Sequence, residues 1–288
     1  MTQAMRATLR SYWSEATRYQ WFLYGAGALL LASGVFHLGV YAVVGGPWEG
    51  DISWRKPIVF GFSFGITLVF LAAVMTFLPR RRVIGWLLAA VLGVTGILET
   101  GLISMQQWRG VPSHFNTATP VDALVFGLMG LLIGFLMLAI FAMTAWTLVS
   151  VRAPRSLAWA IGVGMVLLSV GQVLGASMIA NGSNVFGEGG LMKLPHALSL
   201  HAIEVLPVMA WLLLFSDWNE ASRLRVVLVA AAGYCLLVAA AAYQTFSGVA
   251  PFDMTLPSAV GHGIGVILLA FAGIVVLISL GQKWRRSA

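Results

Sequence analysis

The sequence predicts an all-α integral membrane protein: eight transmembrane helices arranged as two similar four-helix bundles, with both termini in the cytoplasm. Of its 288 residues, 59% are hydrophobic and only 9% are charged, against roughly 25% charged residues in an ordinary soluble domain. Eight spans of roughly 20 to 25 residues would use most of such a chain. This composition excludes a soluble enzyme, a disordered chain, a disulfide scaffold and a nucleic-acid-binding domain.

The polar segment 1–18 comes first, and Met5, Leu9, Tyr12 and Trp13 recur in it at helical spacing. We expect an amphipathic helix in the membrane interface. It is not expected to be a signal peptide, because the apolar run that follows is too long and has no small-residue cleavage site. Each later apolar segment is long enough for one membrane-spanning helix. These segments are 19–45, 56–78, 83–108, 120–149, 156–180, 194–216, 224–247 and 257–281.

Basic residues lie at alternate ends of these segments. With a cytoplasmic N-terminus, 13 of the 17 Lys and Arg residues fall on the cytoplasmic side. The four on the outer side are Arg55, Lys56, Arg109 and Lys193. Because cytoplasmic loops of membrane proteins collect Lys and Arg, this asymmetry predicts two cytoplasmic termini and a multi-pass protein of the plasma (inner) membrane.

Equal spacings predict an interfacial segment, 1–18, followed by two related four-helix halves, 19–150 and 151–288. Every second apolar segment begins near a proline, a residue that suits the first turn of a helix. The prolines recur 138 and 137 residues apart between the halves, as Pro57, Pro120, Pro195 and Pro257. At the offset of 137, Gln107 also falls on Gln244. We interpret the chain as a four-helix unit that occurs twice.

Ionisable side chains are expensive inside a bilayer, so each one in the apolar segments is a candidate for function. Five of them stand out: His37, Glu99, His201, Glu204 and His262. His201 lies six residues after Pro195, and His262 lies five after Pro257. At 1.5 Å of rise per residue, both lie roughly 8–9 Å below the outer helix ends. Two histidines at matching depth in equivalent helices are the most informative feature of the sequence.

The residues alone leave three interpretations of His201 and His262. In the first, both are packed histidines hydrogen-bonded to a neighbouring carbonyl, to Gln172 or to Gln244. In the second, they are the axial ligands of a haem, because neutral imidazoles bind iron well and helix bundles hold cofactors between facing helices. Glycines beside His262, among them Gly261 and Gly263, would let a flat macrocycle approach the backbone.

The third interpretation is a site for copper, iron or zinc. His201 and Glu204 are three residues apart and share a helix face. Together with His37 or Glu99 they would complete a shell of the ligand types that transition metals prefer.

Two stretches of the second half resemble the heme A synthase family. The run Gln-Val-Leu-Gly-Ala at 172–176 is similar to that family's Gln-x-x-Leu-Gly-Ala run, one residue shorter. The stretch from Gln244 to His262 and Gly265 resembles the family's last helical hairpin. Members of the family have two four-helix halves, both termini inside, and haem on the outer side. The resemblance implies that His201 and His262 hold a haem b, with Gln172, Gln244, Gly261 and Gly263 in the surrounding site.

The first half departs from that family. The family has histidines in helices 2 and 4 that serve its porphyrin substrate, whereas the corresponding positions here fall near Ser63 and Val125. We therefore expect a haem b-binding membrane redox protein that does not oxidise a farnesylated haem.

Its electrons would pass to or from a quinone, a redox partner protein or a small substrate. The catalytic candidates are His37, Glu99 and Glu204. The alternative function is a non-haem protein that handles copper or zinc, or a transporter, in which the intramembrane His and Glu residues form a metal or proton pathway.

Overall fold

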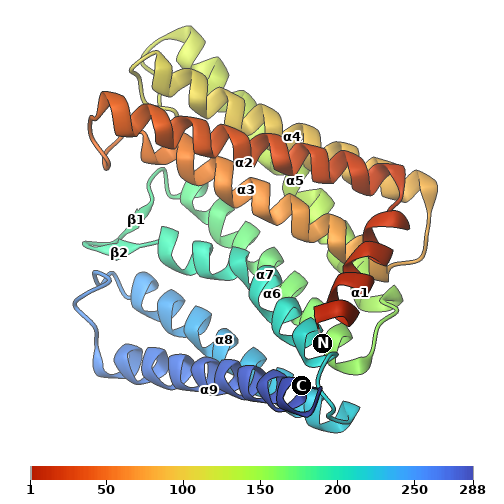
Figure 1. Cartoon of the computed structure of the whole chain (residues 1–288). Helices are drawn as coiled ribbons and strands as arrows, with labels where there is room; N and C mark the ends of the chain where they lie inside the picture. The colour runs from red at the N-terminus through yellow and green to blue at the C-terminus, as the bar shows by residue number, and fades with distance from the viewer. Residues whose placement is uncertain (1, 288) are drawn as a thin grey trace. The chain divides into compact units, whose positions relative to one another are not determined.

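The computed structural model describes residues 2–287, with side chains described for residues 3–283. This part of the chain is almost entirely helical (Figure 1). In chain order its elements are α1 (Thr2–Ser14), α2 (Arg18–Val44), α3 (Arg55–Val74), a short 3-10 helix (Met75–Phe77), α4 (Arg82–Trp108), α5 (Pro120–Ser150), α6 (Arg155–Ala180), β1 (Val185–Phe186), β2 (Gly190–Leu191), α7 (Lys193–Leu213), α8 (Glu220–Phe246) and α9 (Leu256–Ser287).

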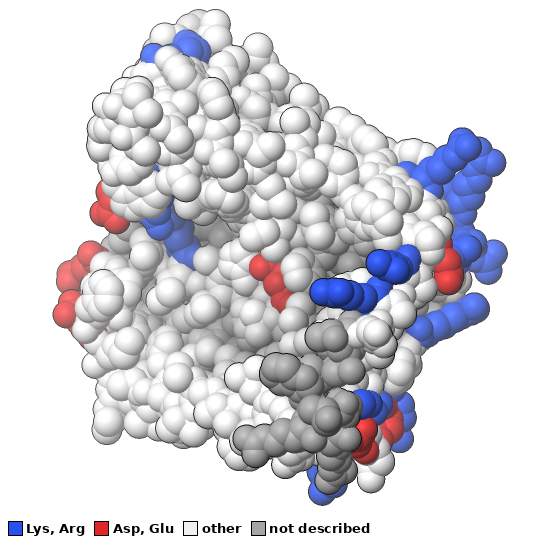
Figure 2. Space-filling model, viewed as in Figure 1, with Lys and Arg blue, Asp and Glu red and all other residues white. Residues whose placement is uncertain are grey.

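Among the described residues, eight helices, α2 to α9, are long and apolar enough to cross a membrane. Most of the surface in Figure 2 is correspondingly free of charged side chains. The prediction of a multi-pass, all-α membrane protein is confirmed. Each span begins within four residues of the predicted start. The largest difference is at α8, which begins at Glu220 because the Asn219 side chain accepts a hydrogen bond from the Ser222 N–H at 2.9 Å and caps the helix.

The amphipathic helix expected near the N-terminus is α1. Leu9 and Trp13 remain 53% and 56% exposed on it, as suits a helix whose apolar face meets lipid. Tyr12 is half-buried. Burial raises the pKa of the Tyr12 phenol, and the neighbouring Trp211 indole lowers it by less. Because Trp211 belongs to the last turn of α7, this contact holds α1 against that end of α7.

The chain forms two compact units, which we call the first-half unit (16–143) and the second-half unit (1–15 together with 144–288). In the first-half unit, α2 packs against α3 through glycines. A Cβ atom on Gly61 would meet the Cα atom of Gly34 at 2.8 Å, and one on Gly27 would meet the Gly65 carbonyl oxygen at 2.8 Å. Helix backbones approach this closely only where side chains are absent.

The second-half unit uses the same packing at two helix pairs. A Cβ atom on Gly164 of α6 would meet the Cα atom of Ile203 of α7 at 2.9 Å. A Cβ atom on Gly265 of α9 would meet the Gly233 carbonyl oxygen of α8 at 2.9 Å. These glycine contacts join α7 to α6 and α9 to α8, and α7 and α9 carry the two candidate haem ligands.

A short antiparallel hairpin, β1 and β2, connects α6 to α7 and was not predicted. A Cβ atom on Gly190 would lie 1.9 Å from the Thr245 carbonyl oxygen, and the Thr245 hydroxyl donates to the Leu191 carbonyl oxygen at 3.2 Å. The hairpin therefore packs directly on the last turn of α8, and no side chain is tolerated at position 190.

The turns that end α4 and α8 share one structure, 138 residues apart. In each, a glycine with positive φ follows the helix, which lets the chain reverse. The side-chain amide of a glutamine in the last turn donates to a carbonyl oxygen six residues further on. The residues are Gln106, Gly110 (φ 68°) and Pro112 (3.5 Å) after α4, and Gln244, Gly248 (φ 73°) and Ala250 (2.6 Å) after α8. These contacts pair Gln106, rather than Gln107, with Gln244.

Candidate functional site

His201 and Glu204 form a hydrogen-bonded pair on α7. The Nδ1 atom of His201 lies 2.8 Å from Oε2 of Glu204. Their side chains are 38% and 14% exposed. An ionised Glu204 accepts a hydrogen bond from Nδ1, and this contact leaves Nε2 directed away from Glu204. No hydrogen bond reaches that Nε2 from any other described residue.

His262 on α9 is held by its own helix. Its Nδ1 lies 2.8 Å from the Ser258 carbonyl oxygen and 3.2 Å from the Ser258 hydroxyl. That hydroxyl donates to Oε1 of Gln244 at 2.5 Å, so Gln244 acts on His262 through Ser258. Here too Nδ1 is engaged, and in the described part of the chain Nε2 has no partner. No hydrogen bond joins His262 to His201 within the described residues.

The other two intramembrane histidines differ. The Nδ1 of His37 on α2 lies 2.8 Å from the Ser33 carbonyl oxygen, and its Nε2 accepts from the Trp108 indole N–H at 3.2 Å. His196 on α7 packs its ring against Gly175 of α6, with Nδ1 2.8 Å from the Gly171 carbonyl oxygen. Both ring nitrogens of His37 are thus hydrogen-bonded within the protein. His196 uses Nδ1 in a hydrogen bond and packs its ring against α6.

The remaining residues assigned to the cofactor site fall into different environments. A Cβ atom on Gly261 would meet Cβ of Ala240 on α8 at 2.8 Å, so Gly261 serves helix packing. Gly263 has nothing within 4 Å and leaves its face of α9 open. Gln172 on α6 is buried, 8% exposed. No hydrogen bond joins it to another described residue.

The glutamate of the first half, Glu99, is 1% exposed on α4, and its Oε2 is buried without a hydrogen-bond partner. Among the described residues, no three His, Cys, Asp or Glu side chains are grouped so that they could hold a metal ion. His37 and Glu99 belong to the first-half unit, and His201 and Glu204 belong to the second-half unit.

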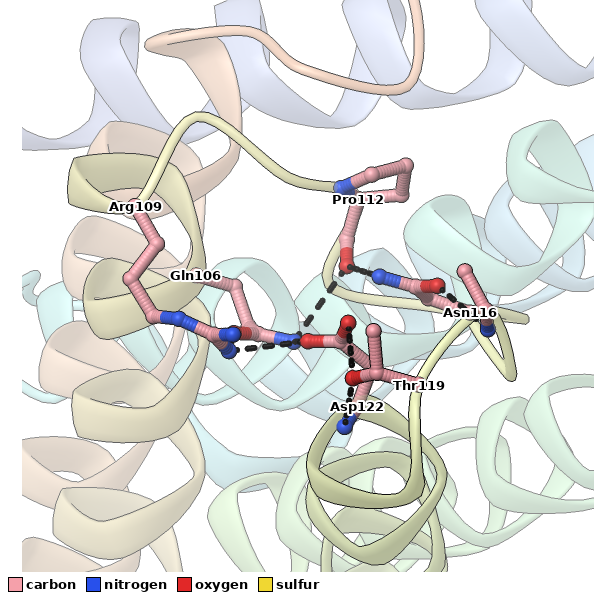
Figure 3. Close-up of polar contacts among 7 residues, drawn as sticks. Gln106, Arg109, Pro112, Asn116, Thr119 and Asp122 are labelled. Carbon is pink, nitrogen blue, oxygen red and sulfur yellow. Dashed lines mark hydrogen bonds and ion pairs between the residues drawn. The ribbon is translucent and has the colours of Figure 1, made fainter.

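A buried polar network in the first-half unit was missed by the sequence analysis (Figure 3). Oδ1 of Asp122 on α5 accepts from Gln106 at 3.0 Å and from Arg109 at 2.8 Å, while Oδ2 accepts from the Thr119 hydroxyl at 2.7 Å. Arg109 also donates to Gln106. Asp122 is only 2% exposed. The sequence did contain a signal for this network: Asp122 lies two residues after Pro120, and the loop before that helix contains the basic residue Arg109.

A cavity of about 530 Å³ opens at the start of α8, where it is lined by Asp217, Trp218, Asn219, Ser222, Arg225 and Val226. None of the candidate site residues lines it, so it does not belong to the site on α7 and α9.

The chain was compared with known proteins at three levels. No protein-family model, no curated protein and no solved structure matches it. Its function is therefore inferred from its own residues and their contacts.

Proposed function

We propose that this protein binds haem b in the second-half unit, with His201 and His262 as the axial ligands, and that it is a membrane redox protein. One observation supports the proposal most. Each of these histidines has Nδ1 engaged in a hydrogen bond and Nε2 without a partner, the state in which an imidazole binds iron. His37 differs because both of its ring nitrogens are hydrogen-bonded. His196 also has only Nδ1 hydrogen-bonded, but its ring packs against the Gly175 position of α6.

Some of the residues around His201 and His262 fit a bound haem, and others do not. Glu204 accepts from His201, and a hydrogen bond of this kind fixes the ring and makes the ligand nitrogen more basic. Ser258 and Gln244 do the same for His262. Gly263 is open, whereas Gly261 is covered by Ala240, so only Gly263 could lie against a macrocycle. When bound, a haem supplies one-electron chemistry; the chain supplies ligands, their orientation and an apolar surrounding.

The resemblance to the heme A synthase family supports the same assignment, since that family's haem b histidines correspond to His201 and His262. The first-half unit does not support that family's reaction, because α3 and α5 contain no histidine. We propose a quinone, a redox partner protein or a small substrate as the electron partner. The competing copper or zinc site would need at least a third ligand near His201 and Glu204, and none is grouped with them among the described residues.

The proposal includes the orientation of the chain in the inner membrane. Thirteen of the 17 Lys and Arg residues lie on the side that we assign to the cytoplasm, where basic residues collect. Both termini would then be cytoplasmic, and His201 and His262 would lie in the outer part of the membrane. The shared turn after α4 and α8 supports the proposal that the two halves are repeats.

An absorbance spectrum of the purified protein tests the haem assignment. We expect a red protein whose Soret band shifts when dithionite is added. His201→Ala and His262→Ala should each remove one strong ligand, so the remaining haem becomes high-spin or is lost. His196→Ala is the matched control, because it also removes a histidine from α7 and should leave the low-spin spectrum unchanged.

Two results would overturn the assignment in protein that is correctly inserted and produced at normal yield. One is a colourless preparation after expression with a sufficient haem supply. The other is a low-spin spectrum that persists in His201→Ala or His262→Ala. Stoichiometric copper or zinc in a colourless sample would favour the metal-handling alternative instead.

A further inference from the structure

The inference concerns Glu99, a buried carboxyl group that the haem proposal does not use. It lies on the inner face of α4 in the first-half unit and is 1% exposed. One turn before it, the Gly96 position faces Phe64 and Leu68. One turn after it, Ile103 belongs to an apolar cluster with Val125 and Met129 of α5. The environment of Glu99 is therefore apolar along α4 in both directions.

The carboxyl group lacks a polar partner in this environment. Its Oε2 is buried with no hydrogen bond, and the hydroxyl of the next residue, Thr100, is also buried with none. Buried polar atoms are normally hydrogen-bonded, so each exception calls for an explanation such as a bound small molecule or a role in chemistry. Two exceptions at consecutive positions of one helix point to a functional position.

The ionisable groups on the neighbouring elements already have other partners. On α2, His37 is bonded to Ser33 and Trp108. At the start of α5, Asp122 is paired with Arg109. At the start of α3, Lys56 donates to the Asp51 carbonyl oxygen. The other ionisable side chains on these elements are Arg18, Tyr19, Tyr24, Tyr41, Arg55 and Arg82. None of these groups donates a hydrogen bond to the buried Oε2 of Glu99.

We propose that Glu99 is a reversible proton-binding site inside the first-half unit. An ionised carboxylate that is buried without a counter-charge is strongly disfavoured. A proton is the smallest ligand that removes this charge, and it needs no cavity. The group is then a neutral carboxylic acid in the resting protein and can give up its proton when an acceptor or a cation reaches it. This site does not depend on haem binding in the other unit.

Two other carboxyl groups of the protein can be compared with that of Glu99. Asp122 and Glu204 are also carboxyl groups within the apolar segments, but each accepts hydrogen bonds, Asp122 from Arg109, Gln106 and Thr119 and Glu204 from His201. Their carboxyl groups therefore have polar partners, which the buried Oε2 of Glu99 lacks. Glu99 should therefore be distinguishable from both by any method that detects a protonated carboxyl group in an apolar environment.

Dicyclohexylcarbodiimide provides such a method with the full-length protein in detergent or lipid. The carboxylic O–H adds across one C=N bond of the reagent, and the acyl group then migrates to nitrogen, so that a stable N-acylurea forms and nothing leaves. At neutral pH we expect one label per chain, located on Glu99 by peptide mass spectrometry. Infrared spectroscopy should show the carbonyl band of a protonated acid, which disappears at alkaline pH and returns at neutral pH.

Two variants complete the test. Glu99→Gln should lose both the label and the infrared band. Ser104→Ala, which removes a hydroxyl of the same helix that is already bonded to the Thr100 carbonyl oxygen, should retain both. The proposal is overturned if folded wild-type protein shows neither signal, if Asp122 or Glu204 takes the label in place of Glu99, or if the band does not respond to pH. Haem content is measured on the same samples and should be unchanged in both variants.

Discussion

At the scale of single residues, the state of each histidine ring depends on one or two contacts. His201 and His262 both lie in apolar helices, as do His37 and His196, and all four are equally plausible ligands by residue type. Only the contacts distinguish them. Trp108 occupies Nε2 of His37, and Gly171 and Gly175 hold His196 against α6. Hydrogen bonds occupy both nitrogens of His37, packing encloses the ring of His196, and Nε2 of His201 and of His262 has neither a hydrogen bond nor such a packing contact among the described residues.

The Asp122 carboxylate allows a residue-scale prediction about stability. Asp122→Ala removes the acceptor for Gln106, Arg109 and Thr119 together. Loss of a buried ion pair can cost 3–5 kcal/mol, but the Arg109 side chain is 38% exposed and can turn to water. We therefore expect the free energy of unfolding to fall by about 1–3 kcal/mol, measured by thermal unfolding in detergent.

Asp253→Ala is the matched control for that prediction. Asp253 is an acidic residue just before α9, in the loop between α8 and α9, and its side chain is exposed. Its removal should leave the unfolding temperature unchanged. Equal unfolding temperatures for the Asp122 and Asp253 variants would show that the network of Figure 3 contributes nothing to stability.

At the scale of elements, glycines determine which helices lie in contact. On α9, Gly261 and Gly265 face α8, whereas Gly263 faces open space. Three glycines within five residues therefore have two different roles. The two that face α8 allow close backbone approach. The third, Gly263, has nothing within 4 Å of its Cβ position.

This difference predicts opposite effects of alanine on α9. In Gly265→Ala the new Cβ would meet the Gly233 carbonyl oxygen at 2.9 Å and Cγ of Leu237 at 2.7 Å. We expect the added methyl group to push α8 and α9 apart and to lower the free energy of unfolding by about 1–3 kcal/mol. In Gly263→Ala the methyl group meets nothing, and the better helix propensity of alanine should keep or raise stability by up to about 1 kcal/mol.

Thermal unfolding of the two variants, compared side by side, checks this prediction. Gly263→Ala is the control for the general effect of alanine in α9, because it lies on the same helix two residues away. An unfolding temperature for Gly265→Ala at or above that of Gly263→Ala would mean that α8 and α9 are not in the close contact described.

At the scale of the whole molecule, hydropathy indicates which segments span the membrane, and charge indicates how the protein is oriented in it. The eight apolar helices establish a multi-pass membrane protein. The distribution of basic residues predicts how that protein is oriented, because Lys and Arg near helix ends are retained on the cytoplasmic side. The predicted orientation would place the candidate haem ligands toward the outer surface.

Reporter fusions check this orientation. A reporter fused after Ala288 and one inserted near Arg80 should both be active in the cytoplasm, whereas one inserted near Asn184 should be active outside it. The three sites bracket both units, so a single missing or additional span would change the result at one of them. An extracytoplasmic signal at Arg80 or Ala288 would reverse or break the proposed topology.

Local pattern alone was sufficient for the helices. A run of apolar residues long enough to span a bilayer is a property of the segment itself, because in hydrocarbon the backbone must form its hydrogen bonds within the helix. The starts of all eight spans could therefore be predicted within four residues. The choice of His201 and His262 by depth also follows from local rise, since helix geometry converts sequence position into height.

Tertiary structure decided what each polar side chain meets. The Trp108 contact of His37 joins positions 71 residues apart, and the cover over Gly261 comes from Ala240 of another helix. Neither contact can be predicted from a local sequence pattern, because both depend on how each helix is rotated toward its neighbours. The same holds for the buried, unpartnered Oε2 of Glu99. Hydropathy sums over a whole segment and so survives small errors in rotation, whereas a hydrogen bond requires two atoms at one distance and one angle.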